Sequence, residues 1–119
     1  MANYYYRKSG YSLGDQFVNM YESSYDLLSR FGIPINIYRA TLKLQEEVQE
    51  FFEAVEKQDL DNAVLEACDV ITSLISTLYN LNITEDELIG AMRSTYLKND
   101  AKTWETHTVI NGMIVRQEK

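Results

Sequence analysis

The chain has 119 residues, of which 45% are hydrophobic and 24% charged, and it carries a formal net charge of −7. That length suits one domain with a single core, so we expect one domain over residues 1–119. An acidic chain without a basic stripe is a poor match for nucleic-acid backbones. Its apolar runs are also far shorter than the roughly 18 to 20 residues of a membrane span. We therefore expect neither nucleic acid nor a membrane as a partner.

The N-terminal segment and the cysteine content bear on the compartment. Residues 1–10 contain no apolar core of the kind that a signal peptide has, and we expect the tyrosines at 4–6 to serve packing or an interface. The single cysteine, Cys68, lies in an apolar run and is expected to be a small buried hydrophobic residue. Both features favour a reducing, cytoplasmic location.

Two helices are predicted on either side of the only proline, Pro34. The first follows Ser12, a plausible N-cap, and its pattern runs to Gly32, which suits a helix C-terminus. The second covers about 37–57 and carries an apolar stripe. That stripe consists of Leu44, Val48, Phe51, Phe52 and Val55.

A third helix is predicted over about 60–80, capped by Asp59 or Asp61. Apolar residues cover most of its circumference, which predicts a buried helix. The segment TEDE at 84–87 is a capping box that opens a fourth helix.

The last segment alternates apolar and polar residues around Asn111-Gly112, which predicts strands near 106–110 and 113–116. The predicted fold is all-α, a four-helix bundle over about 13–104 with a small β-hairpin appended over about 105–117.

The acidic residues are concentrated between the second and third helices. Nine acids and one base, Lys57, lie between positions 46 and 69, so this window carries about eight negative charges. The other nine acids are matched by ten bases. The acids are Glu46, Glu47, Glu50, Glu53, Glu56, Asp59, Asp61, Glu66 and Asp69.

Two pairs of these acids are spaced for a shared site. Glu47 and Glu50 are three residues apart, as are Glu66 and Asp69, so each pair lies on one helix face. If the two helices pack antiparallel, the four carboxylates converge. Oxygen ligands without histidine or cysteine suit hard cations such as Mg²⁺ or Mn²⁺.

A solvated acidic face is the competing interpretation. It is the better account of Glu53 and Glu56, and of Glu46, Glu47 and Glu50 taken alone. Glu66 and Asp69 lie in the helix predicted to be buried, where acids need a partner, and they favour metal.

The segments EEVQE at 46–50 and EACD at 66–69 resemble the EExxE…ExxD signature of MazG-like, all-α nucleoside triphosphate pyrophosphohydrolases. YLKNDAKTW at 96–104 resembles the Lys-Asn element on the last helix of that family. The resemblance implies hydrolysis of a nucleoside triphosphate between the α and β phosphorus atoms, giving monophosphate and pyrophosphate.

Residue roles follow from the same resemblance. Four acids would hold Mg²⁺, with Mn²⁺ a possible substitute, while Glu46 would orient or deprotonate the attacking water. Lys98 and Asn99 would contact the phosphates or sugar of the substrate, and Lys102 is a further candidate for this role. The four metal ligands would be Glu47, Glu50, Glu66 and Asp69.

Two questions stay open at this level. Relatives of the family act on dUTP, dCTP, NTPs in general or phosphoribosyl-ATP, and no residue here distinguishes these substrates. The broad apolar faces predict a homodimer or homotetramer. The alternative from another class is a non-catalytic helical interaction module with a solvated acidic face.

Overall fold

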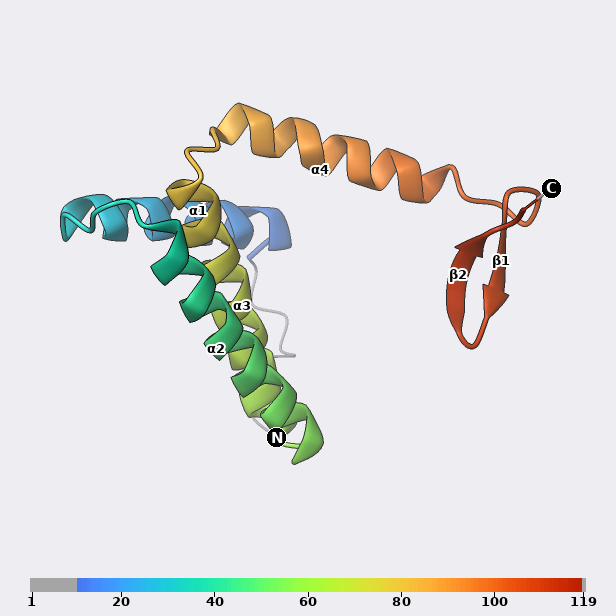
Figure 1. The fold of residues 1–119 in the computed structure, drawn as a ribbon, viewed down its shortest axis with the longest axis horizontal. Coiled ribbons are helices and arrows are strands. Elements are labelled where there is room, and N and C mark those ends of the chain that lie inside the picture. The colour runs from blue at the N-terminus through green and yellow to red at the C-terminus, as the bar shows by residue number, and fades with distance from the viewer. Residues whose placement is uncertain (1–10, 119) are drawn as a thin grey trace. The chain divides into compact units, whose positions relative to one another are not determined.

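A computed structural model describes residues 11–118 of the chain (Figure 1). The helices are α1 (Leu13–Arg30), α2 (Ile37–Glu56), α3 (Leu60–Asn80) and α4 (Glu85–Asp100), and the strands are β1 (His107–Ile110) and β2 (Met113–Arg116). The predicted fold class, all-α with four helices and a C-terminal hairpin, is confirmed. The chain divides into two compact units, one ending at Ile83 and the other beginning at Thr84.

Each helix begins at a side-chain cap, as the sequence predicts for three of the four. Ser12, Asn36, Asp59 and Thr84 each accept a hydrogen bond from the backbone N–H three residues later. These bonds satisfy backbone donors that the first helical turn leaves without partners. At α4, Glu87 also accepts a bond from the Thr84 N–H, which completes the predicted capping box.

Three helices end with the same left-handed turn. Gly32, Gln58 and Asn82 have φ values of 59°, 56° and 59°. In each case the next backbone N–H bonds to a carbonyl of the last helical turn, as in the Ile83 to Leu78 bond of 3.0 Å. This device stops each helix within one residue and fixes the direction of the chain beyond it.

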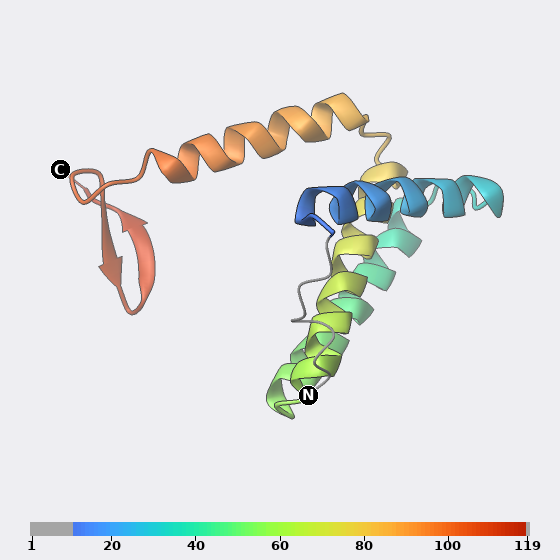
Figure 2. The same ribbon diagram turned by 180° about the vertical axis from the view of Figure 1, so that it is seen from behind.

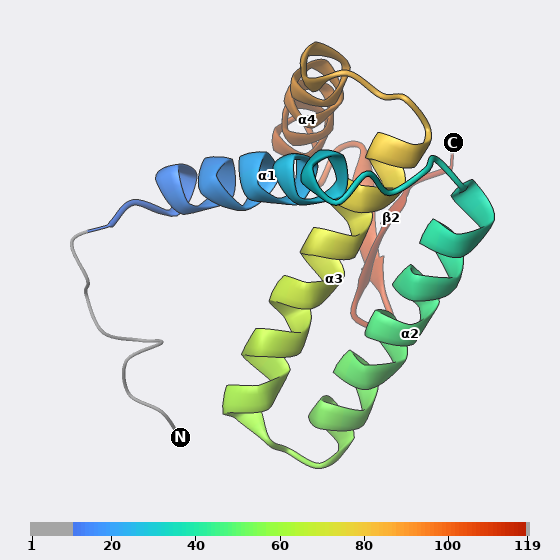
Figure 3. The same cartoon turned by 90° about the vertical axis from the view of Figure 1, so that its left-hand side faces the viewer.

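In the first unit, α2 and α3 run antiparallel and side by side, joined by the turn at 57–59 (Figure 3). Small side chains are buried on both helices, Ala40 and Ala54 on α2 and Ala63 and Ser73 on α3. Small buried residues let two helices approach closely, and this pairing is the framework of the site described below.

Helix α1 crosses the C-terminal end of α3 (Figures 1 and 2). The Tyr25 ring meets the Tyr79 ring edge-on at a centroid distance of 5.0 Å, and its hydroxyl donates to the Ile83 carbonyl at 2.8 Å. Asn80, which is buried, accepts from the Asn36 N–H at 2.7 Å. The end of α3 therefore positions both α1 and the start of α2.

The expectation that α3 is a buried helix is met only in part. Leu65 and Leu74 keep 48% and 46% of their surface exposed, and Cys68 is half-buried. Within the described range, no large side chain is less than 2% exposed. Within residues 11–83, helices α1 and α2 cover part of the circumference of α3 and leave Leu65 and Leu74 about half exposed.

The second unit contains α4 and the hairpin. Strands β1 and β2 pair antiparallel, with Ile110 opposite Met113 beside the turn. Asn111 and Gly112 form that turn with φ values of 52° and 76°, the type I′ geometry that the Asn-Gly pair predicts.

No helix among residues 11–118 is both long and apolar enough to cross a membrane. The tyrosines at 4–6, expected to serve packing or an interface, lie outside the described residues. The single-domain organisation over residues 1–119 stays a prediction.

Candidate metal centre

The acidic window folds into the α2–α3 pair described above. Glu47 lies about three helical turns before the connecting turn, and Glu66 and Asp69 lie two to three turns after it. Because the helices are antiparallel, these three positions come to the same level of the pair. Three of the four carboxylates expected to converge are therefore brought to one level of the pair.

Three carboxylates meet there. One carboxylate oxygen from each of Glu47, Glu66 and Asp69 lies within 4.8 Å of the other two. Glu47 is buried at 7% exposure, Glu66 is half-buried and Asp69 is exposed. The cluster thus reaches from the interior of the α2–α3 pair to its surface, which gives an ion a path to the site.

Two of the carboxylate oxygens in this cluster indicate a cation site. The Oε2 atoms of Glu47 and Glu66 are buried, and neither has a hydrogen-bond partner among the described residues. A buried carboxylate oxygen without a donor is costly unless a positive charge compensates it. Oxygen donors alone suit a hard divalent cation, so the residues present fit such an ion.

Lys43 is a base that pairs with the cluster. Its Nζ lies 2.9 Å from Oε1 of Glu47 and 3.7 Å from Oε2 of Glu46. The hydrogen bond to Glu47 raises the pKa of Lys43 above its ordinary value, and the charges of neighbouring glutamates raise it further. This ammonium pairs with Oε1 of Glu47, while Oε2 of Glu47 and Oε2 of Glu66 stay without a hydrogen-bond partner among residues 11–118.

Glu50 is half-buried one turn beyond Glu47 and lies outside the group of three. The pKa of Glu50 is raised, first by the negative charge of Glu47, then by burial and by the charges of Glu66 and Glu46. Its carboxylate therefore feels the same concentration of negative charge, as expected for a fourth member of the site.

The remaining predicted residues lie at the surface or in the second unit. Glu46 is exposed on α2, beside Lys43. Lys98 and Asn99 are exposed in the last turn of α4, and Lys102 is half-buried just after that helix. The roles expected of these four residues stay predictions.

The burial of the acids differs from the expectation. Glu47, whose helix alone indicated a solvated face, is the most buried of them, whereas Asp69 was expected to be buried and is exposed. Glu53 and Glu56 are exposed, as expected. Sequence reasoning also missed Lys43, although its position four residues before Glu47 is the spacing of a helical ion pair.

Comparison with known proteins adds one positive finding. No curated protein and no solved structure shows significant similarity to the chain. Residues 22–94 match the sequence profile of the family described as phosphoribosyl-ATP pyrophosphohydrolase. The matched segment contains the whole carboxylate cluster and spans more than half of the 119 residues. The chain therefore belongs to the phosphoribosyl-ATP pyrophosphohydrolase family.

Proposed function

We propose that this chain is a divalent-metal-dependent, MazG-like nucleoside triphosphate pyrophosphohydrolase. Its family consists of hydrolases that act on nucleotide phosphoanhydrides. The finer proposal is that the chain cleaves the bond between the α and β phosphates of an NTP or dNTP, releasing monophosphate and pyrophosphate.

The carboxylate cluster is the observation that carries this proposal. Three carboxylate oxygens lie within 4.8 Å of one another, and two buried oxygens of the same residues lack a hydrogen-bond partner in the described structure. Such a site is suited to Mg²⁺, with Mn²⁺ as a substitute. The residues that would hold the ion are Glu47, Glu50, Glu66 and Asp69. A bound divalent ion would neutralise triphosphate charge and acidify a coordinated water.

The other residues are assigned to substrate and water. Glu46 is exposed on the same helix as Glu47 and Glu50, where a carboxylate can accept a proton from an attacking water. Lys98 and Lys102 supply positive charge, and Asn99 supplies an amide, for the phosphates or sugar.

Phosphoribosyl-ATP is a second candidate substrate, favoured by the description of the family that residues 22–94 match. It carries the same triphosphate chain as ATP, so the chemistry required of the carboxylates is the same. Phosphoribosyl-ATP differs from an ordinary NTP in its additional phosphoribosyl group. The bond that is broken is the same in both candidates.

We also propose a homodimer or homotetramer. The support comes from the apolar side chains that the first unit leaves exposed on α1, α2 and α3. Examples are Val18, Phe52, Leu65 and Leu74. Burying apolar side chains of this size between copies of the chain would remove them from water.

The test is a substrate panel. The chain is incubated with the canonical NTPs and dNTPs and with phosphoribosyl-ATP, each with and without Mg²⁺ or Mn²⁺, and the products are separated by chromatography. We expect pyrophosphate plus the matching monophosphate only when metal is present. Absence of turnover on the whole panel, with no thermal stabilisation by either ion, would favour a non-catalytic helical interaction module.

A further inference from the structure

The two faces of the C-terminal hairpin carry different side chains. Residues opposite each other in the strand pairing share a face, and successive residues alternate between faces. Val109 and Ile114 therefore lie on one face, together with His107, while Ile110 and Met113 lie on the other. The segment that follows α4 lines a pocket together with His107, Val109 and Ile114 of the first face and with Thr108.

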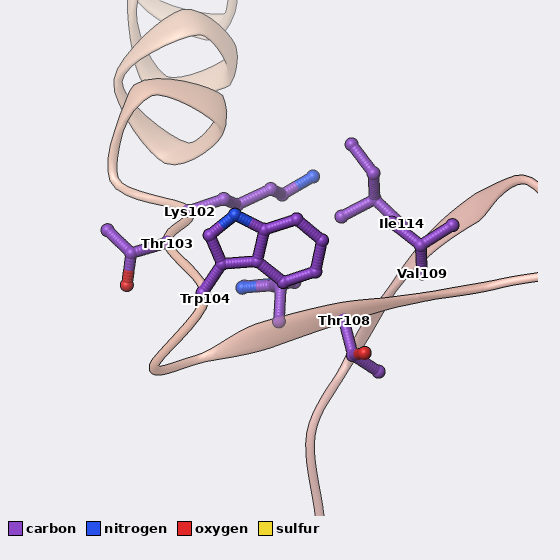
Figure 4. Close-up of a pocket in the computed structure, with 7 residues that line it drawn as sticks. Lys102, Thr103, Trp104, Thr108, Val109 and Ile114 are labelled. Carbon is purple, nitrogen blue, oxygen red and sulfur yellow. The ribbon is translucent and has the colours of Figure 1, made fainter.

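That segment and the first face enclose a pocket of about 260 Å³ (Figure 4). Its lining includes Lys102, Thr103, Trp104, His107, Val109 and Ile114. Trp104, the only tryptophan of the chain, is 75% exposed, so much of its indole is open to solvent.

Hydrogen bonds fix the shape of the pocket. The Gln117 side-chain amide donates to the carbonyl of Trp104 at 2.8 Å and to that of His107 at 3.0 Å. The Gln117 backbone N–H also donates to the Thr106 carbonyl at 2.9 Å. These bonds tie the Trp104 segment to the end of β2, so the indole is held beside the hairpin face.

The walls suit a flat ring. Trp104 provides an aromatic plane, and Val109 and Ile114 provide an aliphatic surface across the pocket (Figure 4). Proteins hold nucleobases by stacking them against aromatic and apolar side chains of this kind. A volume of about 260 Å³ is below the roughly 300 to 1,000 Å³ of sites that enclose a drug-sized ligand. It therefore fits a ring system and leaves a sugar and phosphates outside.

The pocket also has polar groups suited to the phosphate and to the base edge of a nucleotide. The Lys102 ammonium is the only formal positive charge among the lining residues. The His107 Nδ1 atom lies 2.7 Å from the Thr106 hydroxyl, which leaves the other ring nitrogen as a hydrogen-bonding group for a base edge. Apolar walls with one cation and few polar groups are the composition expected for a small-molecule site.

We propose that this pocket, here called the Trp104 pocket, binds the base of a nucleotide, with Lys102 facing its phosphate. The choice of a nucleotide rather than another flat anion rests on the proposed function. The competing occupant is an apolar side chain from a second copy of the chain. An apolar side chain would contact the apolar walls but would leave Lys102 and His107 without a role. We therefore favour the base.

The experiment is a fluorescence titration of the full chain without metal, since Trp104 is the sole indole reporter. The probes are AMP, GMP, CMP and UMP, which have no phosphoanhydride to hydrolyse, together with adenosine and inorganic phosphate. We expect saturable quenching by at least one monophosphate, weaker saturable quenching by its nucleoside, and no effect of phosphate alone. Quenching that rises linearly with every probe reports collisions only and would overturn the proposal.

Two variants in adjacent positions of β2 provide the matched control. Ile114 lines the Trp104 pocket, Met113 faces away from it, and both are 64% exposed. We expect Ile114→Ser to weaken the saturable binding at least tenfold and Met113→Ser to leave it within about twofold of the unmodified chain. Equal loss in both variants, or a Trp104 signal that follows protein concentration instead of ligand, would contradict a base-binding pocket.

Failure of this inference and failure of the proposed function are separable. Metal-dependent release of pyrophosphate without saturable quenching would overturn the Trp104 pocket and leave the hydrolase intact. Saturable quenching without hydrolysis of any panel substrate would support the pocket and count against the hydrolase.

Discussion

Lys43 Nζ lies 2.9 Å from Oε1 of Glu47, one helical turn away, while the Oε2 atom of the same carboxylate is buried without a hydrogen-bond partner in the described structure. The two oxygens of Glu47 therefore face different environments. One is paired with a lysine that is 58% exposed, and the other is buried without a hydrogen-bond partner among the described residues. Without metal, Lys43 compensates the most buried charge of the cluster, and this role has a measurable consequence.

Replacing Lys43 with methionine is expected to destabilise the metal-free protein. Loss of an exposed ion pair costs up to about 1 kcal/mol, and loss of a buried one about 3 to 5 kcal/mol. Because Lys43 is exposed and Glu47 is buried, we expect about 1 to 2 kcal/mol. Chemical denaturation with a chelator present measures this value. Saturating Mg²⁺ should remove most of the difference, because the ion then compensates Glu47.

Lys57→Met is the control for this experiment. Lys57 lies at the end of α2 and forms no ion pair among the described residues. Its loss should change the free energy of unfolding by only a few tenths of a kcal/mol. An equal loss in both lysine variants, or a loss at Lys43 that Mg²⁺ does not reverse, would argue against a role for Lys43 at the cluster.

Metal binding should stabilise the folded chain. An ion present at about 100 times its dissociation constant adds about 2.7 kcal/mol if it binds only the folded state. We expect thermal unfolding to shift upward with Mg²⁺ or Mn²⁺ in the unmodified chain and to shift little in Glu66→Gln. Glu56→Gln, an exposed position on α2, is the matched control and should keep the full shift. The same shift in all three proteins would place the ion elsewhere.

Glu50→Gln should separate activity from stability. We expect turnover to fall by roughly a hundredfold or more, since a proposed metal ligand is removed. The metal-free fold should become more stable, because a carboxylate repelled by Glu47 becomes neutral. Near-full activity in this variant would contradict the four-carboxylate site.

The pH dependence of stability has the opposite sign with and without metal. The pKa of Glu50 is raised in the folded chain, chiefly by Glu47, so its stabilising contribution is present at low pH. That contribution is lost as the pH rises through the raised pKa. In chelator, Glu50→Gln should therefore gain stability relative to the unmodified chain as the pH rises. With saturating Mg²⁺ the difference should reverse, because the ion requires the ionised carboxylate. Thermal unfolding over the acidic range measures both.

Local signals were sufficient to predict the elements of the fold. The predicted ends of α2 and α3 agree with the structure to within a residue, because Asp59 caps one helix and Gln58 ends the other by adopting a positive φ. The turn at Asn111-Gly112 follows from two residues that tolerate positive φ. Such features depend on a few neighbouring residues, and a sequence displays them directly.

Burial could not be predicted in the same way, since it depends on which helix face meets which neighbour. Glu47 is buried because it faces α3, although the sequence of α2 taken alone predicts a charged, solvent-exposed face. Asp69, one turn beyond Glu66, lies at the outer side of the same cluster. Three of the four residues that the i, i+3 spacing singles out, Glu47, Glu66 and Asp69, come together in the fold, but their order of burial depends on the packing of α2 against α3.

Asn80 offers a test of the fold that should leave the metal centre unchanged. Its Oδ1 accepts from the Asn36 N–H at 2.7 Å, and its Nδ2 donates to the Ser76 carbonyl at 2.8 Å, in a buried position. Truncation to alanine leaves the Asn36 donor unsatisfied, so we expect a loss of about 1 to 3 kcal/mol.

Asn62→Ala, at an exposed position early in α3, should cost much less. In both variants the stabilisation by Mg²⁺ should equal that of the unmodified chain, because neither residue belongs to the carboxylate cluster. Denaturation curves with chelator and with Mg²⁺ provide all the values needed. A weaker response to Mg²⁺ in Asn80→Ala would mean that the far end of α3, where α1 and α2 are anchored, also sets the spacing of Glu47 and Glu66.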